Sequence, residues 1–327
     1  MNPVTARRDL VERLLGGPRT LRRREVARAV GISLLSARKL WRALGFPGVG
    51  DEVVAFTDAD RDALERTVQM VRDGVLDEDT TIAMARALGQ STDRLVSWQM
   101  EALMEHLARQ AATGDPVHPV EVVDRLVDDF EQLLVYSWRR QMAAAVNRLS
   151  DSPESGAELT VGFADLVSYT RLSQRLEQRE LSVLVQRFEG LAADVVTTGG
   201  GRVVKTVGDE VLFTAEDPVA AAVIALSISE RMAVDDVVPD VRIGISHGPV
   251  LRSLGDVYGP TVNLASRLTA LAQPGTVITD PLTGKALQDH PQILLVAQRR
   301  RQVRGFGILQ PLLVAPAGPT SQLITVD

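Results

Sequence analysis

The sequence predicts an all-helical region over residues 1–150, followed by an α+β domain over residues 158–327. Two observations predict this division. Apolar residues recur every three or four positions through the first region, which is the period of amphipathic helices. In the second region, short runs rich in β-branched residues alternate with helical patterns. Residues 151–157 between them are polar, contain Pro153 and Gly156, and show no periodicity, so they are predicted to form a linker.

Three segments of the first region have a strong helical period. They cover residues 58–73, 93–110 and 119–149. Thr57 or Asp58 is expected to cap the first segment, and Ser91 with Thr92 the second, because such side chains accept hydrogen bonds from free helix amides.

Residues 19–46 have the pattern of a helix-turn-helix, with a turn at residues 31–33 and a second helix that carries Arg38, Lys39 and Arg42. Residues 1–50 carry eleven basic and three acidic side chains, a net charge of +8, whereas residues 51–150 carry ten and nineteen, a net charge of −9. Two interpretations follow. The basic face reads DNA, or it docks on the acidic stretch behind it, and we favour the second because the two charges are complementary.

The second region reads as an ordered series of strands and helices. The predicted elements are a strand at 158–165, a helix at 170–198, strands at 202–207 and 210–214, a helix at 217–233, a strand at 241–247, a helix at 259–272 and a strand at 276–279. A Gly208-Asp209 turn joins the second and third strands as a hairpin. The order β-α-β-β-α-β is the ferredoxin-like arrangement, in which helices cover one face of one sheet.

Composition limits the chemistry that the chain can perform. It has no cysteine, which excludes disulfides, thiolate metal sites and cysteine nucleophiles. The net charge of −6 argues against a surface wholly adapted to nucleic acid. The longest apolar run, residues 219–228, is about half of the ~20 residues that cross a bilayer, so we expect no membrane association and a cytoplasmic protein.

Three separated stretches of the second region concentrate polar residues at the ends of predicted strands. Asp165 ends the first strand, Asp209 lies in the hairpin turn, and Asn263 and Arg267 are four apart on a helix and therefore face the same way. Two carboxylates suit Mg²⁺ that also binds phosphate oxygens. Backbone amides around residues 167–170 suit a polyphosphate, and an Arg suits a phosphorus transition state.

These stretches, Phe163–Thr170, Lys205–Glu210 and Gly255–Leu268, resemble the catalytic domain of the class III nucleotidyl cyclases, specifically adenylate cyclases. The resemblance covers about residues 158–316 and rests on three motifs in the right order. It implies roles for particular residues. The metal ligands would be Asp165, Asp209 and the Leu166 carbonyl, with two Mg²⁺ or Mn²⁺ ions per site. Lys205 and Asp256 would recognise adenine, and Asn263 would orient the ribose. Arg267 would stabilise charge at the α-phosphate, Arg304 would contact the terminal phosphates, and the substrate site would be completed by Phe163, Ser168 and Thr170.

Ser168 departs from the family, which often has Gly there, and it fits with little strain if its φ is negative. In the late basic run, Arg299–Arg301 are alternatives to Arg304 for the phosphate contact.

The resemblance implies conversion of ATP to 3′,5′-cyclic AMP and pyrophosphate at the interface of a homodimer, where Lys205 and Asp209 of one chain serve different sites. Some similar cyclases carry an all-helical N-terminal domain that regulates catalysis, and we expect residues 1–150 to do so here. Protons, a lipid and a partner protein are all open as the signal. The alternative function is a DNA-binding or nucleotide-sensing regulator whose cyclase-like domain is inactive.

Overall fold

A computed structural model describes residues 3–46, 48–112, 114, 117–149, 158–253 and 255–318. The chain divides into two compact units, residues 1–151 and 152–327. The expected linker at 151–157 lies outside the described residues. None of the helices in the described ranges combines the length and the apolar character that crossing a membrane requires.

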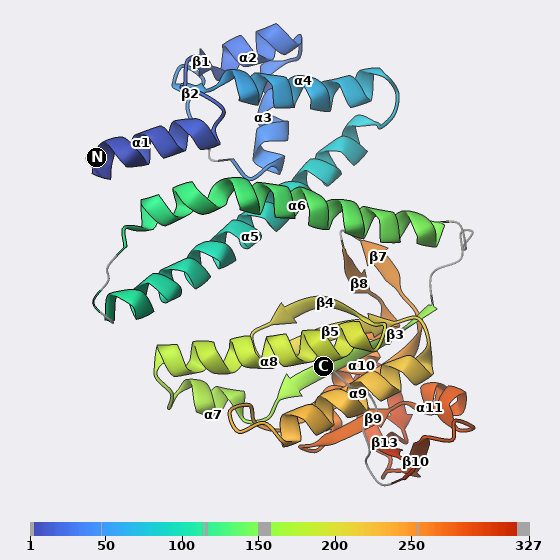
Figure 1. The fold of residues 1–327 in the computed structure, drawn as a ribbon. Coiled ribbons are helices and arrows are strands. Elements are labelled where there is room, and N and C mark those ends of the chain that lie inside the picture. Colours follow the sequence, from blue (N-terminus) through green and yellow to red (C-terminus); the bar gives the residue numbers. More distant parts are fainter. Residues whose placement is uncertain are drawn as a thin grey trace. The chain divides into compact units, whose positions relative to one another are not determined.

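The first unit is built almost entirely of helices (Figure 1). They are α1 (Pro3–Leu14), α2 (Arg23–Val30), α3 (Leu34–Ala43), α4 (Asp58–Arg72), α5 (Glu78–Ala112) and α6 (Pro119–Leu149). The sequence pattern did not predict the short antiparallel pair of β1 (Leu21–Arg22) and β2 (Val54–Phe56). Thr57 caps α4 as predicted, since its side chain accepts from the Asp60 amide.

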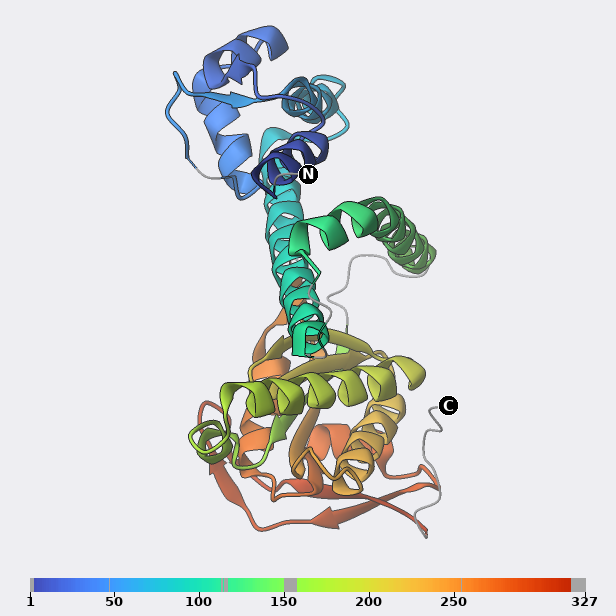
Figure 2. The same cartoon turned by 60° about the vertical axis from the view of Figure 1, so that its left-hand side comes forward.

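The start of α5 was predicted wrongly. The helix begins at Glu78, so Ser91 and Thr92 lie inside it rather than at its N-terminus (Figure 2). The Thr92 hydroxyl donates to the Leu88 carbonyl at 2.8 Å, which is how such a side chain is accommodated within a helix. The small core of this unit surrounds Trp41, with Val26, Leu40 and Phe56 among its buried members.

Basic side chains of the first fifty residues pair with acidic ones that follow in the chain. Arg38 and Arg23 both bond the Asp51 carboxylate, the Arg23 contact at 3.0 Å. Lys39 lies 3.8 Å from Glu78. On α1, Arg13 bonds Asp124 at 3.0 Å and Asp128 at 3.4 Å, both on α6. Part of the positive charge of residues 1–50 is therefore paired with acidic residues of the 51–150 segment.

The second unit contains one seven-stranded sheet with the order β10-β13-β9-β6-β3-β5-β4. Its strands are β3 (Glu158–Leu166), β4 (Arg202–Val207), β5 (Glu210–Ala215), β6 (Val241–Pro249), β9 (Thr276–Thr279), β10 (Ile293–Ala297) and β13 (Leu312–Pro316). Neighbours are antiparallel except β6 and β9, which are parallel. Two small hairpins, β7 (Leu251–Ser253) with β8 (Asp256–Tyr258) and β11 (Arg301–Val303) with β12 (Gly307–Leu309), lie outside this sheet.

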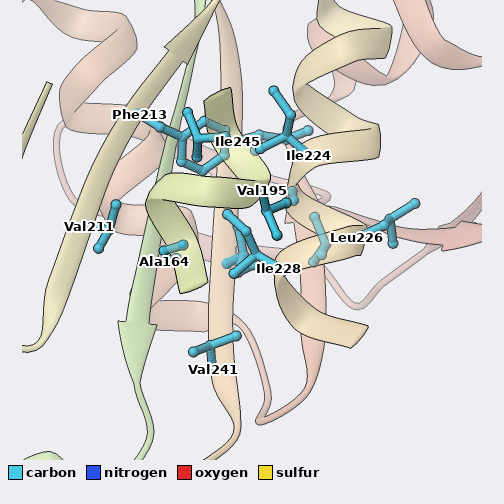
Figure 3. Packing of buried hydrophobic residues seen from close by; sticks show 14 of the residues in the cluster. Ala164, Val195, Val211, Phe213, Ile224, Leu226, Ile228, Val241 and Ile245 are labelled. Carbon is cyan, nitrogen blue, oxygen red and sulfur yellow. The ribbon is translucent and has the colours of Figure 1, made fainter. Parts of the chain in front are cut away.

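One face of the sheet carries the main core of the second unit. The helices α8 (Gln178–Thr198) and α9 (Pro218–Ala233) pack there, and α11 (Pro281–Leu287) adds Leu287 to the same core. Val195 of α8 and Ile224 of α9 face the sheet residues Phe213 and Ile245 in Figure 3, and all four are at most 2% exposed. This large apolar face fixes the sheet on which the site is built.

The opposite face carries α10 (Pro260–Leu271), so the expectation that helices cover only one face was incomplete. Gly244 on β6 makes this packing close. A Cβ built on Gly244 would lie 2.3 Å from the Thr269 amide nitrogen and 2.6 Å from the Ala265 carbonyl oxygen of α10. Phe163, Leu212 and Ala265 belong to a smaller apolar cluster on this face.

The predicted long helix at 170–198 is interrupted. It forms α7 (Tyr169–Ser173) and α8, and Glu177 is the N-cap of α8. The Glu177 amide donates to the Glu180 carboxylate at 3.0 Å, which completes a capping box. The other strands and helices predicted for this unit begin and end close to the predicted residues.

Candidate active site

Asp165 and Asp209 are brought to one end of the sheet by backbone pairing. Asp165 is the penultimate residue of β3, and the amide of the next residue, Leu166, donates to the Asp209 carbonyl at 2.9 Å. Asp209 itself lies in the β4–β5 hairpin, next to Gly208 at a φ of +64°. The Gly-Asp turn therefore places the second carboxylate beside the first, as the two-carboxylate prediction required.

A row of charged residues crosses three adjacent strands at this position. In register, Asp165 of β3 faces Glu210 of β5 on one side and Arg242 of β6 on the other. Side chains of directly paired residues lie on the same face of a sheet. Because side chains alternate along a strand, Asp165 shares its face with Phe163, two residues earlier, and so lies on the side of α10.

Arg242 was not predicted as part of the site. Its Nε and Nη2 atoms both lie 2.6 Å from Oδ2 of Asp165, whose side chain is 13% exposed. The sequence contained one usable signal, because Arg242 is a charged residue in the otherwise apolar start of a buried strand. Its contact holds the Asp165 carboxylate in one orientation.

The carboxylates of this row are crowded. Burial raises the pKa of Asp165, the Arg242 guanidinium opposes this rise, and the nearby Asp209 adds to it. Burial also raises the pKa of Glu210, to about 7, and the charges of Asp165 and Asp209 contribute to that rise. The charges of Arg242 and Lys205 oppose these rises without cancelling them, so the negative charge of the row is only partly balanced, which favours the binding of a cation.

The donor set fits a divalent metal that is shared with a substrate. Within the residues described by the structure, no group of three or more His, Cys, Asp or Glu side chains forms a complete metal site. Mg²⁺ commonly binds one or two carboxylates and takes its remaining ligands from water and substrate phosphates. Asp165, Asp209 and the Leu166 carbonyl would hold Mg²⁺ or Mn²⁺ here, and their role as metal ligands stays a prediction.

Lys205 and Asp256 meet although they are far apart in the sequence. Lys205 Nζ on β4 lies 2.5 Å from Oδ2 of Asp256 on β8. The other oxygen, Oδ1, accepts from the Val257 amide at 2.8 Å. Burial opposes ionisation of Asp256, but Lys205 and this amide outweigh it, and the pKa of Asp256 is lowered. The pair thus presents an ammonium donor beside an ionised carboxylate acceptor.

The turn after β3 differs from expectation in two ways. Ser168 has a φ of +63°, so the condition of a negative φ is not met, and it is the only non-glycine residue with positive φ in the described part of the chain. The Val167 amide was predicted to be available for phosphate. It instead donates to the Asp240 carbonyl at 2.9 Å. Thr170 is exposed in α7. The substrate roles of Ser168 and Thr170 stay predictions.

Asn263 and Arg267 lie four residues apart on α10 and are both exposed. Neither side chain has a hydrogen bond or ion pair within the described ranges. The helix starts with Pro260 at its first turn, after Gly259 at a φ of +127°. Both side chains are therefore free to contact a substrate or another chain.

The remaining predicted contacts are less well placed by the fold. The Phe163 side chain is 7% exposed and packs in the apolar cluster under α10. Arg304 is exposed in the turn between β11 and β12. Arg299 and Arg301 instead line a hollow of about 320 Å³ with Leu271 at the end of α10. Which of these arginines contacts phosphate stays a prediction.

Comparison with known proteins identifies the family of the chain. Residues 152–314 match the family described as the adenylate and guanylate cyclase catalytic domain. The chain is 48% identical over 324 residues to an adenylate cyclase of Glutamicibacter nicotianae, with 93% of this chain and 80% of the relative covered. Its identity to an adenylate cyclase of Streptomyces coelicolor is 38%, with 92% and 87% covered. For an adenylate cyclase of Streptomyces griseus the identity is 41%, with 85% and 71% covered.

The chain therefore belongs to the adenylate and guanylate cyclase family. Within it, the predicted class III adenylate cyclase domain, preceded by a helical N-terminal region, is confirmed.

Proposed function

We propose that the protein is a homodimeric adenylate cyclase that converts ATP to 3′,5′-cyclic AMP and pyrophosphate, with catalysis regulated by residues 1–150. One observation carries the catalytic part. The fold places Asp165 and Asp209 together through the Leu166–Asp209 backbone hydrogen bond, beside Glu210 and with Arg242 as the cation bonded to the row.

The Lys205–Asp256 pair supports ATP as the substrate. An ammonium donates to a ring nitrogen of adenine, and an ionised carboxylate accepts from the exocyclic amine. Guanine presents the opposite pattern at these positions. An aspartate is ionised at neutral pH, and the lowered pKa of Asp256 stabilises this state further, so the pair can recognise adenine.

The reaction joins the ribose 3′-oxygen to the α-phosphorus and breaks the bond between that phosphorus and the oxygen of the pyrophosphate leaving group. The proton of the 3′-hydroxyl leaves to solvent. Two bound divalent ions would activate the hydroxyl and neutralise charge on the phosphates. The chain's own groups position the reactants: Asn263 holds the ribose, and Arg267 donates to the α-phosphate oxygens as their charge increases.

A homodimer supplies both halves of each site. Asp165 and Asp209 of one protomer would face Lys205, Asp256, Asn263 and Arg267 of the partner subunit. The free Asn263 and Arg267 side chains support this arrangement, as does the β7–β8 hairpin, where the paired residues Leu251 and Tyr258 are 65% and 48% exposed. Such an apolar pair is suited to an interface.

The shared site is tested by mixing inactive variants. Asp209→Ala and Arg267→Ala should each abolish cyclic AMP formation from ATP with Mg²⁺ or Mn²⁺. Random exchange of subunits makes half of the dimers mixed, each with one intact site, so activity should return to about a quarter of wild type. The matched control mixes Arg267→Ala with Asn263→Ala, which damage the same half of the site and should not recover. Failure of the first mixture to recover would reject the shared site.

Regulation by the first unit is supported by its charge pairing. Arg38 is bonded to Asp51 and Lys39 lies beside Glu78, so part of the basic face of α3 is already occupied. This favours a regulatory domain over DNA binding. Residues 152–327, if they remain folded by circular dichroism, should differ from the full chain in cyclase activity by a large factor, and equal activities would reject regulation. The cytoplasmic location stays a prediction.

A further inference from the structure

We propose that the helical region contains a binding site for a small organic anion with an aromatic body. The site is a cavity of about 300 Å³ beside α3, which the catalytic proposal does not use. It is lined by Arg23, Arg38, Trp41, Arg42, Phe46 and the segment Gly48–Asp51.

The charge of this cavity is unbalanced. Three guanidinium groups line it together with one carboxylate, that of Asp51. Arg23 and Arg38 share this carboxylate. Arg42 is exposed, and its side chain has no hydrogen bond or ion pair in the part of the chain that the structure describes. Arg38 and Arg42 are four residues apart on α3, so they lie on one side of the helix. An anion beside Arg42 would gain one charge-assisted contact from it and a second from Nη1 of Arg38, because Asp51 bonds only Nε and Nη2 of that guanidinium.

Arg23 gives a second, independent indication. It is 6% exposed, and its guanidinium carbon lies 5.7 Å from the ring centroids of both Trp41 and Phe56. Its Nε atom is buried and has no hydrogen-bond partner. A buried guanidinium with an unsatisfied donor lowers the stability of the fold, and such unsatisfied groups are often found at functional sites. Arg23 therefore contributes a buried guanidinium with an unsatisfied donor to the lining of the cavity.

The walls select the body of the ligand. Trp41 is 4% exposed and packs against Phe56, with ring centroids 4.5 Å apart, so Phe46, which is 49% exposed, is the aromatic ring of the lining that a ligand can reach. Aromatic walls and guanidinium groups both stack on planar groups. The volume is at the lower end of small-molecule pockets, so it suits a ligand of about one ring. A carboxylate and a phosphate share the required anionic chemistry.

The test is calorimetric titration of the full chain with four probes. Phenyl phosphate and benzoate carry the two anionic groups on one ring, benzamide is the neutral control, and inorganic phosphate lacks the ring. At least one aromatic anion should bind, benzamide should not, and inorganic phosphate should bind more weakly. The stronger of phenyl phosphate and benzoate identifies the anionic group.

Two exposed arginines provide matched variants. Arg42→Gln should weaken binding of the aromatic anion by about tenfold, the effect of losing one charge-assisted hydrogen bond. Arg28→Gln on α2 removes the same charge outside the cavity and should leave binding unchanged. Neither side chain has a partner among the described residues, so both variants should fold.

Three results would overturn the proposal. They are equal binding of benzamide, equal loss in Arg42→Gln and Arg28→Gln, and no heat of binding from either aromatic anion at millimolar concentration. Binding of a DNA duplex that Arg42→Gln abolishes, without binding of phenyl phosphate, would assign the surface to nucleic acid instead. The comparison of Arg42→Gln with Arg28→Gln assigns the measured binding to the helical region, so its outcome is distinct from success or failure of the cyclase proposal.

Discussion

Replacement of Gly244 by Ala tests whether the position of α10 sets catalysis. The new Cβ would lie 2.3 Å from the Thr269 amide nitrogen, whereas ordinary contact begins at 3.4 Å. The helix must therefore move away from β6 by the difference, 3.4 − 2.3 = 1.1 Å, unless the strand itself yields. The atoms of α10 that the new Cβ would contact belong to the backbone, so rotation of a side chain cannot relieve the contact.

This displacement has two consequences. Overpacking of a close-packed interface costs about 1–3 kcal/mol of stability. Asn263 and Arg267 move with α10, and a misplacement of about 1 Å in a catalytic site can reduce turnover by about a hundredfold. We therefore expect Gly244→Ala to lose both stability and most of its cyclic AMP formation, even under conditions in which the variant is fully folded.

Gly162→Ala is the matched control. Gly162 lies on β3, and a Cβ there would be 2.2 Å from Cζ of Phe213, which belongs to the core on the face opposite α10. Urea unfolding should show a comparable loss of stability for both variants, whereas turnover per folded molecule should fall sharply only in Gly244→Ala. Equal turnover in the two variants would refute the argument that α10 must sit close to β6.

Three further predictions concern single residues. Ser168→Gly should stabilise the protein by about 0.5–1 kcal/mol in urea unfolding, because the left-handed penalty of about 1–2 kcal/mol exceeds the added entropy cost of about 0.4–1 kcal/mol; a loss of stability would contradict this. Glu210→Gln should be more stable relative to wild type at pH 8 than at pH 5. The folded pKa of Glu210 is about 7, above the ordinary 4.5, so the stability of the wild type falls as pH rises between these values, and glutamine removes this loss. The same pH dependence of stability in both proteins would count against the raised pKa. Asp235→Asn should lose about 1 kcal/mol at pH 7 through its bonds to Arg187, Val237 and Val238. The pKa of Asp235 is lowered, so this difference should begin to shrink as pH falls below 3.8 and should vanish only below the lowered folded pKa.

The catalytic fold was largely predictable because its signals are local. The strand at 276–279 is observed at the predicted residues, and the Gly208-Asp209 turn forms the hairpin that the sequence indicated. Both depend on β-branched runs and on a glycine with positive φ, which act within a few residues. The proximity of Asp165 and Asp209 follows from this local order once the strands are adjacent.

Features set by distant contacts were not predictable in the same way. Gly89 precedes Ser91 and Thr92, and together they resemble a helix boundary, yet all three lie within α5. A Cβ on Gly89 would lie 2.5 Å from the backbone of Leu44, so glycine is required there by the approach of the end of α3 rather than by a turn. A long-range contact thus explains what appears locally to be the start of a helix.

The same reasoning explains why the sequence did not identify Arg242 or the face that α10 covers. Arg242 and Asp165 are 77 residues apart, and only the β3–β6 register makes them neighbours. That register also places Gly244 opposite Phe163, which opens the face for α10. One strand therefore orients the Asp165 carboxylate, a proposed metal ligand, through Arg242 and seats α10, which carries Asn263 and Arg267, through Gly244, two residues later. Because both depend on the same register, a one-residue slip of β6 would move both residues to the opposite face and remove both contacts together.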